Sequence, residues 1–193
     1  MIALALALAV LAATARGPDP LGPEVDVAIG SPAPAPTCAP TLARYPVAGP
    51  HNGGYDRNWA TQTCAPHPAD ARDGSDFGRP RHVANDLFAR EGTPVVAAAA
   101  GTVVALLDAP HVGLGVVVRD NCGWHALYAH LSRVTVSAGA AVAAGDRLGD
   151  VGRTGGAKRT APHLHFALFP ERYGAGVDPF PLLQPVDATA CTE

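Results

Sequence analysis

Short apolar runs separated by glycine and turn residues dominate the chain from residue 81 onward. Runs of β-type side chains occupy residues 94–99, 102–107, 116–119, 124–128, 134–136, 141–142 and 164–168. Short runs rich in valine and leucine and bounded by turn residues are typical of strands. No convincing amphipathic helix interrupts them. The pattern therefore predicts an all-β fold, built as a compact, twisted antiparallel sheet or a barrel-like sandwich.

The clearest turn in this region lies between the runs at 116–119 and 124–128. The residues between them are Asp120, Asn121, Cys122 and Gly123. Asp, Asn and Gly are favoured in turns because they tolerate the backbone angles that a tight reversal requires. We expect a β-hairpin at this point.

The chain begins with an apolar segment at residues 1–15, which is short for a membrane span. It ends in Ala13-Thr14-Ala15, an Ala-x-Ala type of cleavage site. No Lys or Arg precedes the segment, so an uncleaved anchor or a misassigned start is the alternative. We interpret it as a signal peptide and predict an exported protein, periplasmic, in the cell envelope or extracellular, without a stable membrane span.

Three further segments are distinguished by composition. Residues 16–40 are rich in Pro, Ala and Gly and read as a semi-rigid linker. Residues 41–80 are turn-rich and are expected to form an irregular cap or N-terminal extension. We assign residues 81–183 to one folded domain and 184–193 to a C-terminal tail.

Composition restricts the partners and the redox setting. The net charge is −3 and the 14 basic residues are scattered, so nucleic acid has little electrostatic support as a partner. The four cysteines are Cys38, Cys64, Cys122 and Cys191, and they include no C-x-x-C pair. In an oxidising compartment they would form disulfides, for which three pairings are open. Reduced, buried cysteines are the alternative in the cytoplasm.

Residues that can bind a metal recur within the β-type region. They are His82, Asp86, His130, His163 and His165. Imidazole and carboxylate are ligands that zinc accepts. Because side chains alternate along a strand, His163 and His165 are expected to point to the same face. By the same rule His130 is expected to share a face with Tyr128 and Trp124.

Four other histidines are not expected to bind a metal. His51, His67, His111 and His125 lie in loops or out of phase with His130. We expect them to be surface residues or hydrogen-bonded core residues.

Four segments resemble, in order, the motifs of lysostaphin/LytM-type zinc endopeptidases. RHVANDLFAREGTPVVAAAAGTVV resembles the opening motif, with a His, an Asp four residues later and a Gly-Thr-Pro-Val strand. ALYAHLSRVTVSAGAAVAAGDRLGDVGRTG resembles the central Tyr-x-His-Leu segment, and APHLHFAL the closing His-x-His strand. VDPFPLL resembles the Asp-Pro end, so that the resemblance spans roughly residues 80–182.

The resemblance implies both a fold and an activity. The fold would be the duplicated hybrid motif, an antiparallel sheet with a narrow groove, and residues 81–183 would be a zinc metallopeptidase domain. His82, Asp86 and His165 would bind one zinc ion, leaving an open position for water. His130 and His163 would be the catalytic histidines. The substrate would be stem or cross-link peptides of peptidoglycan, hydrolysed by a monomeric enzyme.

Two positions depart from the family pattern, and other functions compete. Ala84 stands where the family usually has Gly, and Ala167 where it often has Glu. The first alternative is a catalytically silent LytM-type regulator or binding module of the cell envelope. The second is a biotinyl or lipoyl carrier, but Lys158 lacks the setting of a carrier lysine. A third hypothesis is that His51 or Asn52 occludes the metal.

Overall fold

The computed structural model describes residues 34–52, 82–171 and 175–187. The predicted signal peptide, most of the predicted linker, residues 53–80 of the predicted cap and residues 188–193 of the tail lie outside this part. No helix in the described part of the chain is long and apolar enough to span a membrane.

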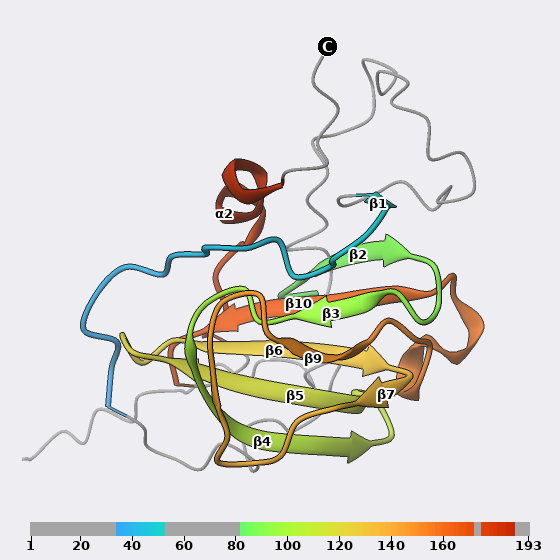
Figure 1. Cartoon of the computed structure of the whole chain (residues 1–193), viewed down its shortest axis with the longest axis horizontal. Helices are drawn as coiled ribbons and strands as arrows, with labels where there is room; N and C mark the ends of the chain where they lie inside the picture. Colours follow the sequence, from blue (N-terminus) through green and yellow to red (C-terminus); the bar gives the residue numbers. More distant parts are fainter. Residues whose placement is uncertain (1–33, 53–81, 172–174, 188–193) are drawn as a thin grey trace, which may run out of the picture.

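A seven-stranded antiparallel sheet forms the centre of the molecule (Figure 1). Its strands, in spatial order, are β1 (His51–Asn52), β2 (Asn85–Ala89), β10 (His163–Phe169), β6 (His125–Leu131), β5 (Gly113–Asp120), β4 (Gly101–Ala109) and β8 (Ala141–Val142). The interior strand β10 pairs with β2 on one side and with β6 on the other. Strands that are far apart in sequence are thereby brought side by side.

A smaller sheet packs against one face of the large one. It consists of β3 (Pro94–Val96), β9 (Arg147–Asp150) and β7 (Arg133–Val134), which lie in front of the large sheet in Figure 1. Val95 and Leu148 of the small sheet belong to the same buried cluster as Val116, Tyr128 and Phe166 of the large sheet. Burying each large apolar side chain contributes about 1.5–3 kcal/mol to the stability of the fold. This layer holds the larger of the two buried clusters and is called the main core.

The opposite face of the large sheet carries a second apolar cluster. It includes Val117, Leu127, Ala129, Ala167 and Phe169, all fully buried. Because both faces are covered, all seven residues of β10 are buried. Burial on both faces explains why this strand reads as a continuous apolar run rather than as an alternation.

The all-β prediction is confirmed, and the two sheets stay open rather than closing into a barrel. The helical elements α2 (Phe180–Leu183), η2 (Gly155–Arg159) and η4 (Gln184–Val186) are all short. The predicted hairpin joins β5 to β6. Its turn is held by the Asp120 carboxylate, which accepts the backbone N–H groups of Cys122 at 2.9 Å and Trp124 at 2.8 Å.

The segment at residues 34–52 is fastened to both sheets. Cys38 forms a disulfide with Cys122, and the indole of Trp124 donates to the Cys38 carbonyl at 2.7 Å. Val47 is buried and bridges Val95 of β3. Of the three possible pairings of the four cysteines, the one that includes this bond would also join Cys64 to Cys191. Those two cysteines lie outside the described residues.

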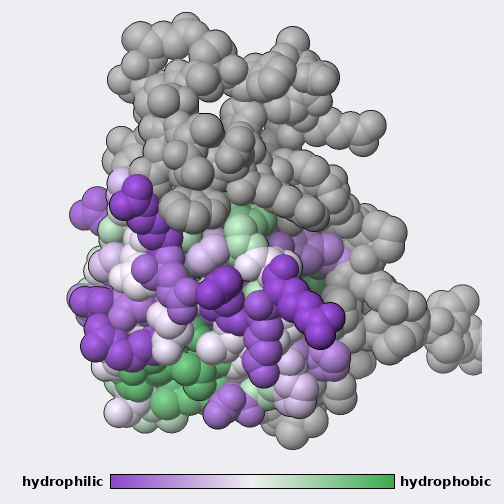
Figure 2. Space-filling view, turned by 90° about the vertical axis from the view of Figure 1, so that its right-hand side faces the viewer, coloured by the Kyte–Doolittle hydropathy of each residue, from purple (hydrophilic) through white to green (hydrophobic). Residues whose placement is uncertain are grey.

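The surface contrasts with these interiors. On the side seen in Figure 2, hydrophilic residues are prominent on the described surface, and the largest hydrophobic area lies at the lower left. Across the described residues, Leu106 is the large hydrophobic side chain that is exposed, at 43%. Apolar side chains are therefore concentrated in the two clusters on either side of the large sheet.

Candidate active site and metal centre

Three neighbouring strands bring four of the five predicted site residues together, and His82 lies just before the first of them. Asp86 lies on β2 and His165 on β10, and the two are directly opposite in the antiparallel register. His165 also pairs with Ala129 of β6, the residue before His130. Directly opposite residues have Cβ atoms about 4.5–5.5 Å apart. The sheet register therefore fixes the side chains of Asp86 and His165 next to each other.

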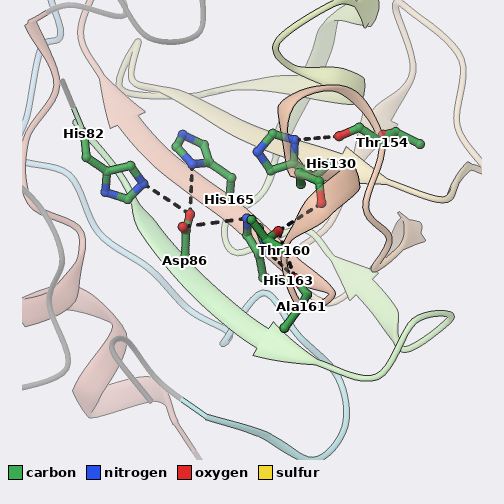
Figure 3. A network of polar contacts seen from close by, with 9 residues as sticks. His82, Asp86, His130, Thr154, Thr160, Ala161, His163 and His165 are labelled. Atoms are coloured by element: carbon green, nitrogen blue, oxygen red, sulfur yellow. Dashed lines mark hydrogen bonds and ion pairs between the residues drawn. The ribbon is translucent and has the colours of Figure 1, made fainter. Parts of the chain in front are cut away.

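One carboxylate oxygen is the point on which two imidazoles converge (Figure 3). Nε2 of His82 lies 3.2 Å from Oδ1 of Asp86, and Nδ1 of His165 lies 3.0 Å from the same oxygen. The rings of His82 and His165 meet edge to face, with centroids 5.0 Å apart. One atom from each residue can be chosen so that all three lie within 4.8 Å of one another. These three residues, whose candidate metal-ligand atoms lie close together, are called the donor group below.

His130 and His163 lie beside this group, and each ring is held by a hydrogen bond to a backbone carbonyl. Nδ1 of His130 donates to the Thr154 carbonyl at 3.0 Å, and Nδ1 of His163 donates to the Ala161 carbonyl at 2.8 Å. A carbonyl oxygen can only accept, so the proton of each neutral ring sits on Nδ1. The lone pair of each ring is then on Nε2. For His163 this atom lies 3.7 Å from Oδ2 of Asp86.

His130 reaches the site through a β-bulge. Leu114 of β5 pairs with Leu131 and Val116 pairs with Tyr128, so Ala129 and His130 together oppose one residue. His130 is the non-glycine residue with positive φ in the described chain, at 65°. Such an extra residue in the left-handed region breaks the strict alternation of side chains.

The expectation that His130 shares a face with Tyr128 and Trp124 is therefore wrong. The Tyr128 ring lies in the main core, 5.3 Å from Phe166. The His130 ring instead lies 5.1 Å from that of His163 and 5.5 Å from that of His165, on the other face. His163 and His165, by contrast, do share a face, as the alternation rule predicts.

Burial is the largest influence on the pKa of these groups. It raises the pKa of Asp86, but hydrogen bonds from His165 and His82, together with nearby charge, outweigh it and hold that pKa well below its usual value. Burial lowers the pKa of His165, and it lowers the pKa of His130 to about 3, with a further contribution from His165 and His163. At neutral pH the carboxylate is thus ionised and these imidazoles are neutral, as metal binding and proton acceptance require.

With this geometry in place, comparisons with known proteins decide the family. The model of peptidase family M23 matches residues 80–179, just over half of the chain. The chain belongs to peptidase family M23. The match contains all five of the residues described above.

Known M23 relatives include wall hydrolases. The M23 chain is 35% identical over 108 residues to the peptidoglycan DD-endopeptidase ShyA of Vibrio cholerae, which corresponds to 56% of this chain and 21% of that protein. It resembles the catalytic domain of lysostaphin from Staphylococcus simulans with a TM-score of 0.52 and 32% identity, covering 57% of this chain and 84% of that domain. It resembles a zinc-containing peptidase from Vibrio cholerae with a TM-score of 0.51 and 25% identity, covering 73% of this chain and 40% of that one.

The match is local in the longer relatives. The chain spans 14–23% of the length of the first five curated relatives. The shared part is therefore the M23 domain and not the whole architecture of those proteins.

The M23 donor set fits zinc by its chemistry. Two imidazoles and one carboxylate are among the ligand combinations of catalytic zinc sites. Ligand atoms of a tetrahedral zinc, with bonds of about 2.0–2.2 Å, lie about 3.3–3.6 Å apart. The contacts of 3.2 and 3.0 Å around Asp86 are close to that spacing. His82, Asp86 and His165 could therefore close around an ion with small adjustments.

The other histidines in the described part of the chain lie outside this M23 site. The His51 ring donates from Nδ1 to the Gly49 carbonyl at 2.7 Å, and its Nε2 lies 3.2 Å from Asp187. Occlusion of the metal by His51 or Asn52 stays a hypothesis. His125 is a buried, hydrogen-bonded core residue, as expected. His111 is exposed, and His67 lies outside the described residues.

Both departures from the family pattern lie in the apolar cluster next to the site. Ala84 and Ala167 are fully buried, and Ala167 is two residues from His165 on the same face of β10. A charged side chain at 167 would be costly among these neighbours. The sequence offered no signal for Thr154 and Ala161, because they contact the histidines through backbone carbonyls.

Proposed function

We propose that this M23 chain is an exported zinc metalloendopeptidase that hydrolyses peptide bonds in peptidoglycan. His82, Asp86 and His165 would hold one zinc ion, and His130 and His163 would act as the catalytic histidines. One observation carries the proposal. Beside the three-residue donor group stand two further imidazoles, each with its proton on Nδ1 and its Nε2 lone pair available. A purely structural metal site has no use for such a pair.

Zinc held by three protein ligands polarises a carbonyl oxygen and lowers the pKa of water to about 7. The chain supplies the proton transfers. Nε2 of one of the pair His130 and His163 can accept the proton that water loses when its oxygen attacks the peptide carbonyl carbon. The protonated ring can return that proton to the amide nitrogen as the C–N bond breaks. The other ring can donate a hydrogen bond to the carbonyl oxygen while it carries negative charge, once its Nε2 is protonated.

Peptidoglycan as the substrate rests on the relatives. Several proteins that match this chain are named as peptidoglycan endopeptidases, including ShyA. Export is expected from the apolar segment at residues 1–15 and from the disulfide between Cys38 and Cys122, which is stable in oxidising compartments. A monomer is expected.

The test measures zinc content and release of dye from labelled peptidoglycan in three proteins. Wild type and His111→Ala, which removes an exposed histidine, should each contain about one zinc per chain and release dye. His165→Ala should lose both properties, because it removes one of three ligands. Zinc without dye release in the wild type would favour the catalytically silent regulator. No zinc in the wild type would refute the ligand assignment.

A further inference from the structure

The backbone of His130 is held in a conformation that a histidine does not adopt by preference. Its φ of 65° lies in the left-handed region, which is unfavourable for a residue with a Cβ. Strained residues of this kind persist only where their surroundings impose the conformation. The contacts that impose it therefore determine where the ring points.

Most of those contacts come from one residue, Thr154. Its carbonyl accepts the Nδ1–H of His130 at 3.0 Å (Figure 3). Its backbone N–H donates to the His130 carbonyl at 3.4 Å. A third bond joins the His130 N–H to the Val112 carbonyl at 3.0 Å. Thr154 thus holds both the ring and the backbone of His130.

The Thr154 hydroxyl fixes the position of Thr154 itself. It accepts the backbone N–H of Leu114 at 2.9 Å and donates to the Leu131 carbonyl at 2.8 Å. Leu114 and Leu131 are paired across β5 and β6 on the far side of the bulge from Tyr128. The hydroxyl therefore bridges the two strand ends between which His130 is displaced.

Two glycines make this contact close. Gly113 and Gly155 have φ of 65° and 61°, and a Cβ on Gly113 would overlap the Thr154 hydroxyl. A Cβ on Gly155 would overlap the backbone of Gly113. The loop that carries Thr154 is thus seated directly against the start of β5.

We propose that Thr154 is a positioning residue whose hydroxyl clamps the bulge and so aims the Nε2 lone pair of His130 at the donor group of Asp86 and His165. The catalytic consequence rests on the proposed hydrolase function. The structural consequence does not, because the orientation and tautomer of His130 can be measured without turnover.

The experiment compares Thr154→Val, which keeps the shape but removes the hydroxyl, with Thr154→Ser, which restores it. Thr135→Val is the matched control, because the Thr135 hydroxyl also donates to a backbone carbonyl, that of Arg147, in the small sheet. Two quantities are measured on the full-length, zinc-loaded protein. They are the tautomer of His130, from the ¹⁵N shifts of its ring, and kcat and KM on a labelled peptidoglycan peptide.

In wild type, Thr154→Ser and Thr135→Val, His130 should be a single Nδ1–H tautomer with kcat within about threefold. In Thr154→Val the ring signals should show both tautomers, and kcat should fall by about 10–100-fold with KM within about twofold. If Thr154→Val does not fold, Thr154→Ala, which lacks the hydroxyl and adds no volume, carries the same expectation.

Two results would overturn the proposal. One is a folded hydroxyl-free variant that keeps the single tautomer and the wild-type kcat. The other is a loss of activity that Thr154→Ser shares, which would make the role one of general packing. If the wild type itself has no turnover, the hydrolase function fails, and the tautomer alone then decides the role of Thr154.

Discussion

The strand β6 begins with His125 and carries a second histidine, His130, next to its last residue, and the two differ in a way that explains the site. His125 and His130 are both buried, and both donate from Nδ1 to a backbone carbonyl, of Pro170 at 2.8 Å and of Thr154 at 3.0 Å. Burial lowers the pKa of both. In tautomer and protonation state the two rings are alike.

Their neighbours are not alike. The His125 ring stacks on Phe169, with centroids 5.5 Å apart and planes 14° from parallel. The His130 ring is turned by the bulge toward His163 and His165. A fixed tautomer and a lowered pKa are therefore insufficient evidence for a catalytic histidine. What sets His130 apart is a ring that lies beside two other imidazoles rather than stacked on a phenyl ring.

The largest test of this comparison is a pair of identical substitutions, His130→Asn and His125→Asn. Asparagine keeps an N–H donor near the position of Nδ1 and tolerates left-handed backbone, but it has no counterpart of Nε2. His130→Asn should lower kcat by about 10²–10⁴-fold. His125→Asn should leave kcat within about threefold and lower the free energy of unfolding by about 0.5–3 kcal/mol. Equal losses of kcat in two folded variants would show that the site does not distinguish the rings.

The bulge also marks the limit of prediction from sequence. The apolar runs located the strands of the main core, because valine and leucine between turn residues are a strong signal. The strand β2 has the sequence NDLFA and β9 has RLGD. Their polar residues belong to the site or to an ion pair, and they interrupt the apolar pattern by which a strand is predicted. Asp150 of β9, for example, is buried and pairs with Arg133 and Arg147.

At the site, sequence reasoning selected residue types and missed one orientation. His163 and His165 face the same way because side chains alternate regularly along β10, as predicted from the sequence. The alternation rule failed for His130, because a single extra residue in β6 shifts the register. Nothing in the side chains of Tyr128 or Ala129 announces that shift. The carbonyl partners, such as that of Thr154, are equally invisible, because every residue has a carbonyl.

The disulfide sharpens the comparison with a smaller effect. Cys38 and Cys122 are 84 residues apart and join the N-terminal segment to the turn just before His125. The double variant Cys38→Ala/Cys122→Ala should lower the free energy of unfolding by about 2–4 kcal/mol in urea titrations. Because the bond lies at the His125 end of β6, kcat at 25 °C should stay within about twofold. A large fall in kcat of the folded variant would show that the two ends are coupled.

The smallest expected effect is a pH dependence carried by His125. Burial lowers its pKa, with Arg119 lowering it further, while the hydrogen bond to Pro170 and the charge of Asp120 raise it. In the unfolded chain its pKa is about 6.5. Between the two values the unfolded chain binds more protons, so stability rises with pH. The contribution is therefore complete above about pH 6.5 and is lost progressively as the pH falls toward the folded pKa.

Urea unfolding at pH 7.5 and pH 5.5 measures this contribution, in excess EDTA so that metal binding does not intervene. The wild type should lose more stability on acidification than His125→Asn, by at most about 1.4 kcal/mol per pH unit, the limit for one proton. His130, His165 and Asp86 titrate in both proteins, so their contributions cancel in the difference. An equal loss in the two proteins would mean that the pKa of His125 is the same in the folded and the unfolded chain. The similarity of the two rings of β6 would then be the part of the comparison that fails.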